Sequence, residues 1–182
     1  MNRRIFVTLV SAAAMLAGSA IASNPVVGGK EMFPNKNIVE NAVNSADHTT
    51  LVAAVKAAGL VETLQGPGPF TVFAPVNAAF DKLPEGAVAN LLKPENKATL
   101  VQVLTYHVVA GRLSSMDLKK EIKAHSGMYM LKTVSGGTLC AMLDGNAIVL
   151  KDEKGGMAKI TQANVFQSNG VIHVIDTVVM PN

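Results

Sequence analysis

The sequence predicts an α+β fold in which a cluster of short helices precedes a set of antiparallel β-strands. Apolar residues recur at helical spacing in much of residues 37–110, and after Gly111 the spacing shifts towards period two. Connectors that contain Gly or Asn separate the later segments, as expected for strand reversals. Helices first and strands second is the order of an α+β fold. No repeat of fixed period is visible, which argues against a solenoid or propeller.

The composition indicates one well-buried domain with an N-terminal appendage. The chain has 182 residues, of which 49% are hydrophobic and 16% charged. Residues 1–22 combine the basic pair Arg3-Arg4, an apolar stretch and the small-x-small sequence Ala20-Ile21-Ala22. This is the pattern of a secretory signal cleaved after Ala22, and the apolar core is short for a membrane anchor. We therefore expect a secreted chain, periplasmic or extracellular, with no stable membrane insertion after cleavage.

Charge and cysteine content narrow the classes of partner. Without Arg3 and Arg4 the 16 basic residues become 14, against 13 acidic ones, and the lysines are scattered. The sequence thus gives no electrostatic support for binding to nucleic acid. Cys140 is the only cysteine, so no internal disulfide can form. It lies in an apolar run, which favours a small buried packing residue over a reactive thiol.

The first half of the chain carries recognisable helix boundaries. Residues 23–36 lack periodicity and are expected to be a flexible mature N-terminus without core residues. Asn37 is a good N-cap, with Glu40 placed to complete a capping box. Asp47 is expected to cap the second helix, and Gly59 to end it in the left-handed conformation.

A strand and further helices are expected next. The Gly-Pro connection at 66–69 leads into a strand at 70–74 that stops at Pro75. Asn77 is expected to be the N-cap of the following helix. A short helix before Pro94 precedes a longer one that ends at Tyr106-His107.

The second half of the chain reads as successive antiparallel hairpins. In the closing stretch, Asn169-Gly170 is expected to supply two positive-φ positions of a tight turn, and a β-branched run follows it. His173, Asp176 and Thr177 interrupt that run with groups that burial penalises unless they are paired. The strands are expected at 128–134, 138–143, 147–151, 157–166 and 171–180.

No catalytic or metal-binding motif is recognisable. The sequence has no Gly-x-Ser-x-Gly elbow, His-Glu-x-x-His motif, phosphate-binding loop or cysteine pair. The four histidines are far apart, so no metal and no cofactor is predicted. Among them, His48 and His125 are expected to be ordinary exposed residues.

His107 and Asp176 differ because both lie among apolar neighbours. Buried polar groups are normally hydrogen-bonded, so we expect these two to pair near Asn77 and to lock the fold. The alternative is that the Tyr106-His107 edge is recognised by a partner. A hydrolase using His107 and Asp176 is a further alternative, but it lacks a paired nucleophile.

Three stretches together resemble the fasciclin (FAS1) domain family. They are Thr71-Val72-Phe73-Ala74-Pro75-Val76-Asn77-Ala78-Ala79-Phe80, the pair Tyr106-His107, and Asn169-Gly170-Val171-Ile172-His173-Val174-Ile175-Asp176-Thr177-Val178-Val179-Met180-Pro181. The first and last are similar to the two homology boxes of the family, and the pair is similar to its central Tyr-His motif. The resemblance covers residues 37–181, and its form is similar to the bacterial secreted single-domain branch.

The resemblance implies a wedge of antiparallel β-sheets packed against a cluster of helices. It also implies a non-catalytic role in adhesion, with Tyr106, His107, Asn164 and Val165 as partner-binding positions. In animal members an Asp-Ile pair is implicated in integrin binding, and Asn164-Val165 stands there instead. A neutral Asn cannot replace a carboxylate that would bind a receptor-held cation.

Two functional hypotheses follow. The first is a secreted module that mediates cell adhesion or protein contacts, with an unidentified cell-surface or extracellular protein or polymer as its partner. The second is a carrier of a small ligand, such as a lipid, a sugar or haem, which would need an apolar pocket between helices and sheet.

Overall fold

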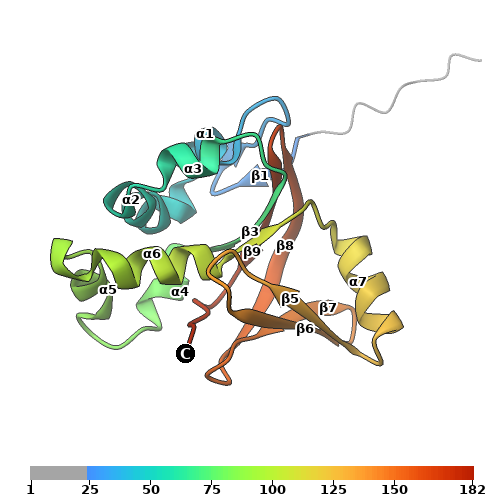
Figure 1. The fold of residues 1–182 in the computed structure, drawn as a ribbon. Helices are drawn as coiled ribbons and strands as arrows, with labels where there is room; N and C mark the ends of the chain where they lie inside the picture. Colours follow the sequence, from blue (N-terminus) through green and yellow to red (C-terminus); the bar gives the residue numbers. More distant parts are fainter. Residues whose placement is uncertain (1–23) are drawn as a thin grey trace, which may run out of the picture.

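The computed structural model describes residues 24–182 and shows the expected α+β fold, with most helices on one side of a strongly curved sheet and the last helix on the other (Figure 1). The signal peptide predicted for residues 1–22 lies outside the described residues. The helices are α1 (Ile38–Asn44), α2 (Thr49–Ala58), α3 (Val61–Gln65), α4 (Asn77–Asp81), α5 (Ala87–Leu91), α6 (Lys97–Tyr106) and α7 (Ser115–Ala124), with 3₁₀ turns at Ala46–His48 and Pro94–Asn96.

The strands form a two-stranded hairpin and a seven-stranded sheet. The hairpin is β1 (Val26–Val27) with β2 (Lys30–Glu31). The strands of the large sheet are β3 (Phe70–Pro75), β4 (Val108–Ala110), β5 (Met128–Lys132), β6 (Thr138–Asp144), β7 (Ala147–Lys151), β8 (Met157–Gln167) and β9 (Gly170–Ile175). Their order in the sheet is β4-β3-β9-β8-β7-β6-β5.

The predicted antiparallel succession is confirmed from β5 to β9, but the sheet also contains a parallel pair. β9 runs parallel to β3, with Phe70 opposite Gly170 and Val72 opposite Ile172. β4 pairs antiparallel to β3 on its other side. A bridge between Val109 and Thr133 brings the two ends of the sheet together. β3 and β9, the first and last strands of the large sheet along the chain, therefore lie side by side in the centre of the molecule (Figure 1).

The turn before β9 differs from its prediction. Neither Asn169 nor Gly170 has a positive φ, and Gly170 is already part of β9. A Cβ atom on Gly170 would collide with the carbonyl oxygen of Phe70 on β3 and would touch the side chain of Ile38. Glycine is therefore required at this position because two backbones approach closely, and the turn needs no left-handed residue.

The helix caps confirm two predictions and correct two. The Asn37 side chain accepts from the Glu40 amide, and the Glu40 carboxylate accepts from the Asn37 amide, both at 2.9 Å. Gly59 ends α2 with φ of 74°. Asp47 does not cap α2, because it lies inside a 3₁₀ turn. Asn77 does not cap α4 either: it is the first residue of that helix, and its side chain reaches back to the start of α2.

The segment at 24–36 contributes to the core, contrary to the prediction. Val27 and Met32 are buried with the residues of α1 and α2. The Gln162 side chain donates a hydrogen bond of 3.1 Å to the Val26 carbonyl, which ties the β1–β2 hairpin to β8. The sequence did not reveal this because a two-stranded hairpin is too short to show periodicity.

The buried side chains form two cores on opposite faces of the sheet. One lies between β3, β9 and helices α1, α2, α3 and α6. The other lies between α7 and the curved strands β5–β8, and is called the α7-side core below. No helix within residues 24–182 is long and apolar enough to span a bilayer.

Candidate functional site: an apolar groove between the helices and the sheet

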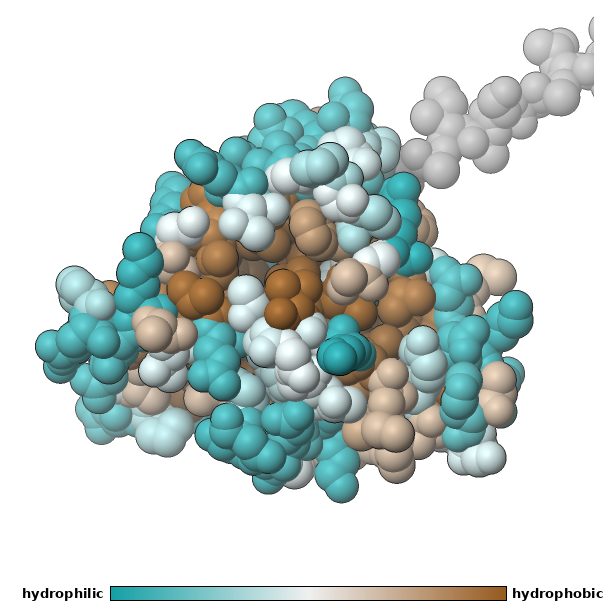
Figure 2. All heavy atoms as spheres, viewed as in Figure 1, coloured by the Kyte–Doolittle hydropathy of each residue, from teal (hydrophilic) through white to brown (hydrophobic). Residues whose placement is uncertain are grey.

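A groove opens where helices α1, α2 and α3 meet strands β3 and β9 and the end of α6. It encloses a space of about 70 Å³. Figure 2 shows apolar side chains gathered in a hollow across the face of the molecule, between the helices above and α6 below. Its walls are almost entirely apolar and include Ile38, Val39, Leu51, Val52, Val55, Leu60, Val61, Leu64, Phe70, Val72, Leu104, Val165 and Ile172.

The size of the groove limits what it can hold in this conformation. Sites for drug-sized ligands enclose roughly 300–1,000 Å³, several times more than this space. An apolar cavity of about 150 Å³ can stay dry and bind benzene. Several groove residues at its rim, including Val52, Leu60, Val61 and Phe70, are only half-buried. The groove therefore suits a slender apolar group, or a larger one if these rim side chains move.

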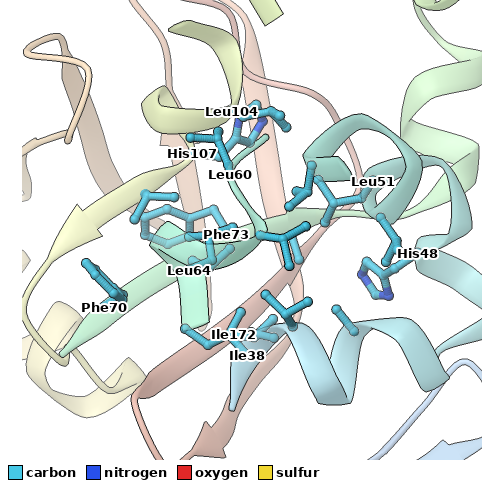
Figure 3. Close-up of a pocket in the computed structure, with 18 of the residues that line it drawn as sticks. Ile38, His48, Leu51, Leu60, Leu64, Phe70, Phe73, Leu104, His107 and Ile172 are labelled. Carbon is cyan, nitrogen blue, oxygen red and sulfur yellow. The ribbon is translucent and has the colours of Figure 1, made fainter. Parts of the chain in front are cut away.

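His48 is the main polar group in the groove wall, and the prediction that it is exposed is wrong. Its side chain is only 3% exposed, at the opposite end of the groove from Phe70 (Figure 3). Nδ1 lies 2.8 Å from the hydroxyl of Ser45, and Nε2 has no hydrogen-bond partner. Burial lowers the pKa of His48, and the Ala74 backbone and Asp47 oppose this only partly. The ring is therefore a neutral group with a free nitrogen.

His107 also borders the groove, but both its ring nitrogens are used by the fold. Nε2 accepts from the Val179 amide at 3.2 Å, so Nδ1 carries the proton and donates to the Val103 carbonyl at 2.8 Å. Burial lowers the pKa of His107 to about 4. Neither nitrogen is hydrogen-bonded to a Ser or Thr hydroxyl, so the histidine has no nucleophile to activate. We therefore abandon the hydrolase hypothesis.

Tyr106 lies on the other side of the sheet, in the α7-side core. Its side chain is fully buried; the hydroxyl donates to the Thr138 carbonyl at 2.7 Å and accepts from the Glu153 amide at 3.2 Å. Burial raises the pKa of Tyr106 to about 12. The expected Tyr106-His107 recognition edge is thus not at the surface, because adjacent residues at the end of α6 point into the two opposite cores.

Asn164 and Val165 lie at an irregular position of β8. Asn164 has φ of 62°; its side-chain oxygen accepts from the Ser115 amide at 2.7 Å, and its amide nitrogen donates to the Ser115 hydroxyl at 2.7 Å. Its main-chain N–H donates to Nδ1 of His173 at 3.3 Å. Val165 is buried and faces the groove. Asn164 thus attaches the start of α7 to the sheet, and partner binding by these two residues stays a prediction.

The predicted pair of His107 and Asp176 is wrong. Asp176 lies just beyond β9, where its carboxylate accepts from the Lys159 amide at 2.9 Å and from the Thr177 hydroxyl at 3.0 Å. The Asn77 oxygen accepts from the Thr50 amide at 3.0 Å and its amide nitrogen donates to the Ala46 carbonyl at 3.0 Å. His107, Asp176 and Asn77 therefore each join different segments of the chain. This supports a separate fold-locking role for each of them.

Sequence reasoning missed Asn169 as an internal polar anchor beside the groove. Its side-chain oxygen accepts from the Ile38 amide at 3.0 Å, and its amide nitrogen donates to the carbonyls of Leu64 and Gly66 at 2.7 and 3.0 Å. From the sequence alone, Asn169 is predicted only as a turn residue. Within residues 24–182, no group of three or more His, Cys, Asp or Glu side chains could hold a metal ion.

Comparisons with known proteins agree with the architecture. The Fasciclin domain family matches residues 46–181. Protein sll1483 of Synechocystis sp. is 47% identical over 145 residues, which cover 79% of this chain and 73% of that protein. Cell surface glycolipoprotein MPB83 of Mycobacterium bovis is 35% identical over 166 residues, covering 88% of this chain and 68% of that protein.

A solved FAS1 domain pair from the insect cell adhesion molecule Fasciclin I has a TM-score of 0.71 to this chain. The identity is 18%, and the match covers 80% of this chain and 51% of that one. The helical layer packed on a curved, mostly antiparallel sheet is thus a FAS1-type α+β fold. The chain belongs to the fasciclin domain family, which confirms the resemblance of its three motifs.

Proposed function

We propose that this chain is a non-catalytic module that binds a small, mainly apolar ligand outside the cytoplasm, with the apolar groove as its site. The observation that carries the proposal is the near-absence of polar groups from a hollow that reaches the surface between helices and sheet. The location outside the cytoplasm is supported by the signal-like residues 1–22 and by the surface location stated in the name of MPB83.

The groove walls indicate the chemistry of the ligand. Burial of apolar surface contributes about 25 cal/mol per Å², so a slender hydrocarbon chain gains affinity with each part that the groove covers once its rim side chains have moved. A sugar would leave its hydroxyl groups without partners there. Nε2 of His48 is a buried atom of the wall without a hydrogen-bond partner. A rotation of the ring towards the groove would let it form one hydrogen bond to a hydroxyl or carbonyl group at the end of the ligand.

The test is a fluorescence titration of the full chain with N-phenyl-1-naphthylamine, an apolar probe that emits strongly only in an apolar site. We expect saturable binding of one probe per chain and its displacement by a long-chain fatty alcohol. Val52→Trp should fill the groove from α2 and abolish binding, since Val52 is a half-buried lining residue. Val43→Trp is the matched control, because Val43 is 51% exposed on α1 and does not line the groove. Equal probe binding by the two variants would contradict the proposal.

A second candidate function is adhesion through contact with a partner protein. It is favoured by the structural similarity to a cell adhesion molecule, Fasciclin I. The test is the retention of cells on a surface coated with the folded chain, compared with a surface coated with albumin. Retention above the albumin level would support adhesion. Equal retention by Val52→Trp would show that the adhesive surface lies outside the groove. Retention at the albumin level would count against adhesion.

A further inference from the structure

Four sulfur-containing side chains lie next to each other on strands β5 and β6. Met128 is paired with Met142, and Met130 is paired with Cys140, in the antiparallel register of the two strands. These four residues are called the sulfur quartet below. They form a block of two residues on each strand, at the lower right of the fold in Figure 1.

The whole quartet faces away from the α7-side core. Leu131, Leu139 and Ala141 alternate with the quartet residues and are buried against α7. Successive side chains of a strand point to opposite faces, so the quartet lies on the outer face of the sheet. Met128 is 47% exposed and Met130 is 68% exposed, while Cys140 and Met142 are half-buried. The prediction that Cys140 is buried in the core is therefore wrong.

Packing does not explain this choice of residues. Exposed strand positions are usually occupied by β-branched or polar side chains, and methionine offers neither property. Residues 128–142 nevertheless contain three of the nine methionines of the chain and its only cysteine. All four sulfur-containing residues of this hairpin fall on one face, within two adjacent cross-strand pairs.

The spacing of the quartet allows its sulfur atoms to converge on one ion. Opposite residues of an antiparallel pair have Cβ atoms about 4.5–5.5 Å apart, and alternate residues along a strand are about 7 Å apart. A methionine sulfur lies two bonds beyond Cβ on a flexible chain and can turn towards the centre of the block. A cysteine sulfur lies only one bond beyond Cβ. A shared ion would therefore lie nearer to the Cβ atom of Cys140 than to the Cβ atoms of the methionines.

We propose that the sulfur quartet is a binding site for a soft monovalent metal ion, Cu(I) by preference. Thioether and thiolate ligands select soft ions, whereas Mg²⁺ and Ca²⁺ require oxygen ligands. Binding replaces the thiol proton of Cys140 by the metal, so one proton is released and the oxidation state does not change. The thiolate and a monovalent ion together are neutral. A divalent ion would leave a net positive charge next to Lys151, which is paired with Cys140 on β7.

The test is a titration of the full chain with Cu(I) under anaerobic conditions, in competition with the chromophoric chelator bicinchoninate. We expect one Cu(I) per chain. Because even changes in the outer shell of a metal site cost about 10–100-fold in affinity, Cys140→Ser and Met130→Leu should each weaken binding by more than about tenfold. Met116→Leu is the matched control and should leave the affinity unchanged, since Met116 is 77% exposed on α7.

A second readout separates binding at the quartet from a loss of folding. In chains labelled with ¹³C at the methionine methyl groups, Ag(I) should shift the signals of Met128, Met130 and Met142 and leave that of Met116 in place. Met and Leu have similar volumes, so Met130→Leu should keep the thermal midpoint of the wild type within a few degrees. Wild-type Cu(I) affinity in a variant that combines Cys140→Ser with Met128→Leu, Met130→Leu and Met142→Leu would overturn the proposal. Methyl shifts confined to Met116 would overturn it as well.

Discussion

The main-chain amide of Val179 donates a hydrogen bond of 3.2 Å to Nε2 of His107, and this contact joins the end of α6 to the C-terminal segment. The acceptor role of Nε2 requires the proton on Nδ1, which faces the Val103 carbonyl at 2.8 Å. Protonation of the ring would place a hydrogen on Nε2, and that N–H would face the main-chain N–H of Val179. The contact is therefore compatible only with a neutral histidine.

This arrangement predicts that acid destabilises the fold. Burial lowers the pKa of His107 from 6.5 to about 4. Between pH 6.5 and pH 4, the unfolded chain therefore binds a proton at this ring that the folded chain does not bind. The stabilisation is fully present above pH 6.5 and is lost as the pH falls towards 4. For His107 alone the loss at pH 4 is about 3 kcal/mol. Burial lowers the pKa of His48 and of His173 as well, and so acts in the same direction. Urea unfolding measured from pH 7.5 to pH 4 checks the slope.

Two glutamine variants identify the residue responsible. His107→Gln should lower the free energy of unfolding at pH 7 by about 1–3 kcal/mol, because the hydrogen bonds of the ring are lost or distorted. The free energy of unfolding of this variant should also depend less on pH below pH 6.5. His125→Gln is the control: His125 is exposed at the end of α7, and its replacement should keep the wild-type slope. An unchanged slope in His107→Gln would show that other groups cause the acid sensitivity.

Asn169 is predicted to be among the most sensitive polar positions. Its amide group makes three hydrogen bonds to main-chain groups of α1 and of the segment that ends α3, all shielded from water to a large extent. Asn169→Ala leaves buried donors and acceptors without partners, and we expect a loss of about 2–4 kcal/mol in the free energy of unfolding. Asn44→Ala is the control, because Asn44 makes one exposed bond to the Glu40 carbonyl and should cost under about 1 kcal/mol. Similar thermal midpoints for the two variants would contradict this.

The features that the sequence predicted correctly are those set by near neighbours. The capping box joins Asn37 to a residue three positions later, and Gly59 directly follows the apolar stripe of its own helix. The positions of β5 to β8 follow from alternation and turn residues. The last strand was predicted to run to residue 180 but ends at Ile175, where Asp176 accepts a hydrogen bond from the Lys159 amide. The family motifs then supplied the overall architecture, because they occur in register along the chain.

The features that were missed depend on contacts between distant segments. Asn77 is typical of an N-cap, yet the nearest free donors belong to residues 27 and 28 positions earlier, at the start of α2. His48 resembles an exposed residue of a polar turn, and only the packing of that turn over β3 buries it. The groove is missed for the same reason. Many of its lining residues belong to the apolar stripes of helices, and such a stripe does not indicate where a helix and a strand pack loosely enough to leave a groove.

Gly170 tests the close approach of β9 to β3. Gly170→Ala places a methyl group against the carbonyl oxygen of Phe70, and neither backbone can move without breaking the parallel pair. We expect a loss of about 3 kcal/mol or more, at the upper end of the usual range for point substitutions. Gly145→Ala is the control for backbone strain: its φ is 60° and its Cβ would meet no atom within 4 Å. It should cost only about 1–2 kcal/mol. A lower urea midpoint for Gly170→Ala than for Gly145→Ala would show that the steric collision is the larger cost. The reverse order would show that the loss of glycine flexibility is the larger cost.

The hydrogen bonds of Asp176 are predicted to stabilise the fold more than its ion pair does. The Asp176 carboxylate accepts from the Lys159 amide on β8 at 2.9 Å, whereas Lys82 lies 3.9 Å away and both side chains of the pair are well exposed. Exposed ion pairs contribute about 0–1 kcal/mol, and a hydrogen bond to a charged group contributes about 1.5–3 kcal/mol. Asp176→Ala should therefore lower the urea midpoint clearly, and Lys82→Ala only slightly. High salt should leave this difference intact, because a short hydrogen bond is screened less than a distant pair. Lys82 also donates to the Thr177 hydroxyl at 3.1 Å. If Lys82→Ala proved as costly as Asp176→Ala, the contacts of Lys82 would account for the loss and the prediction would be wrong.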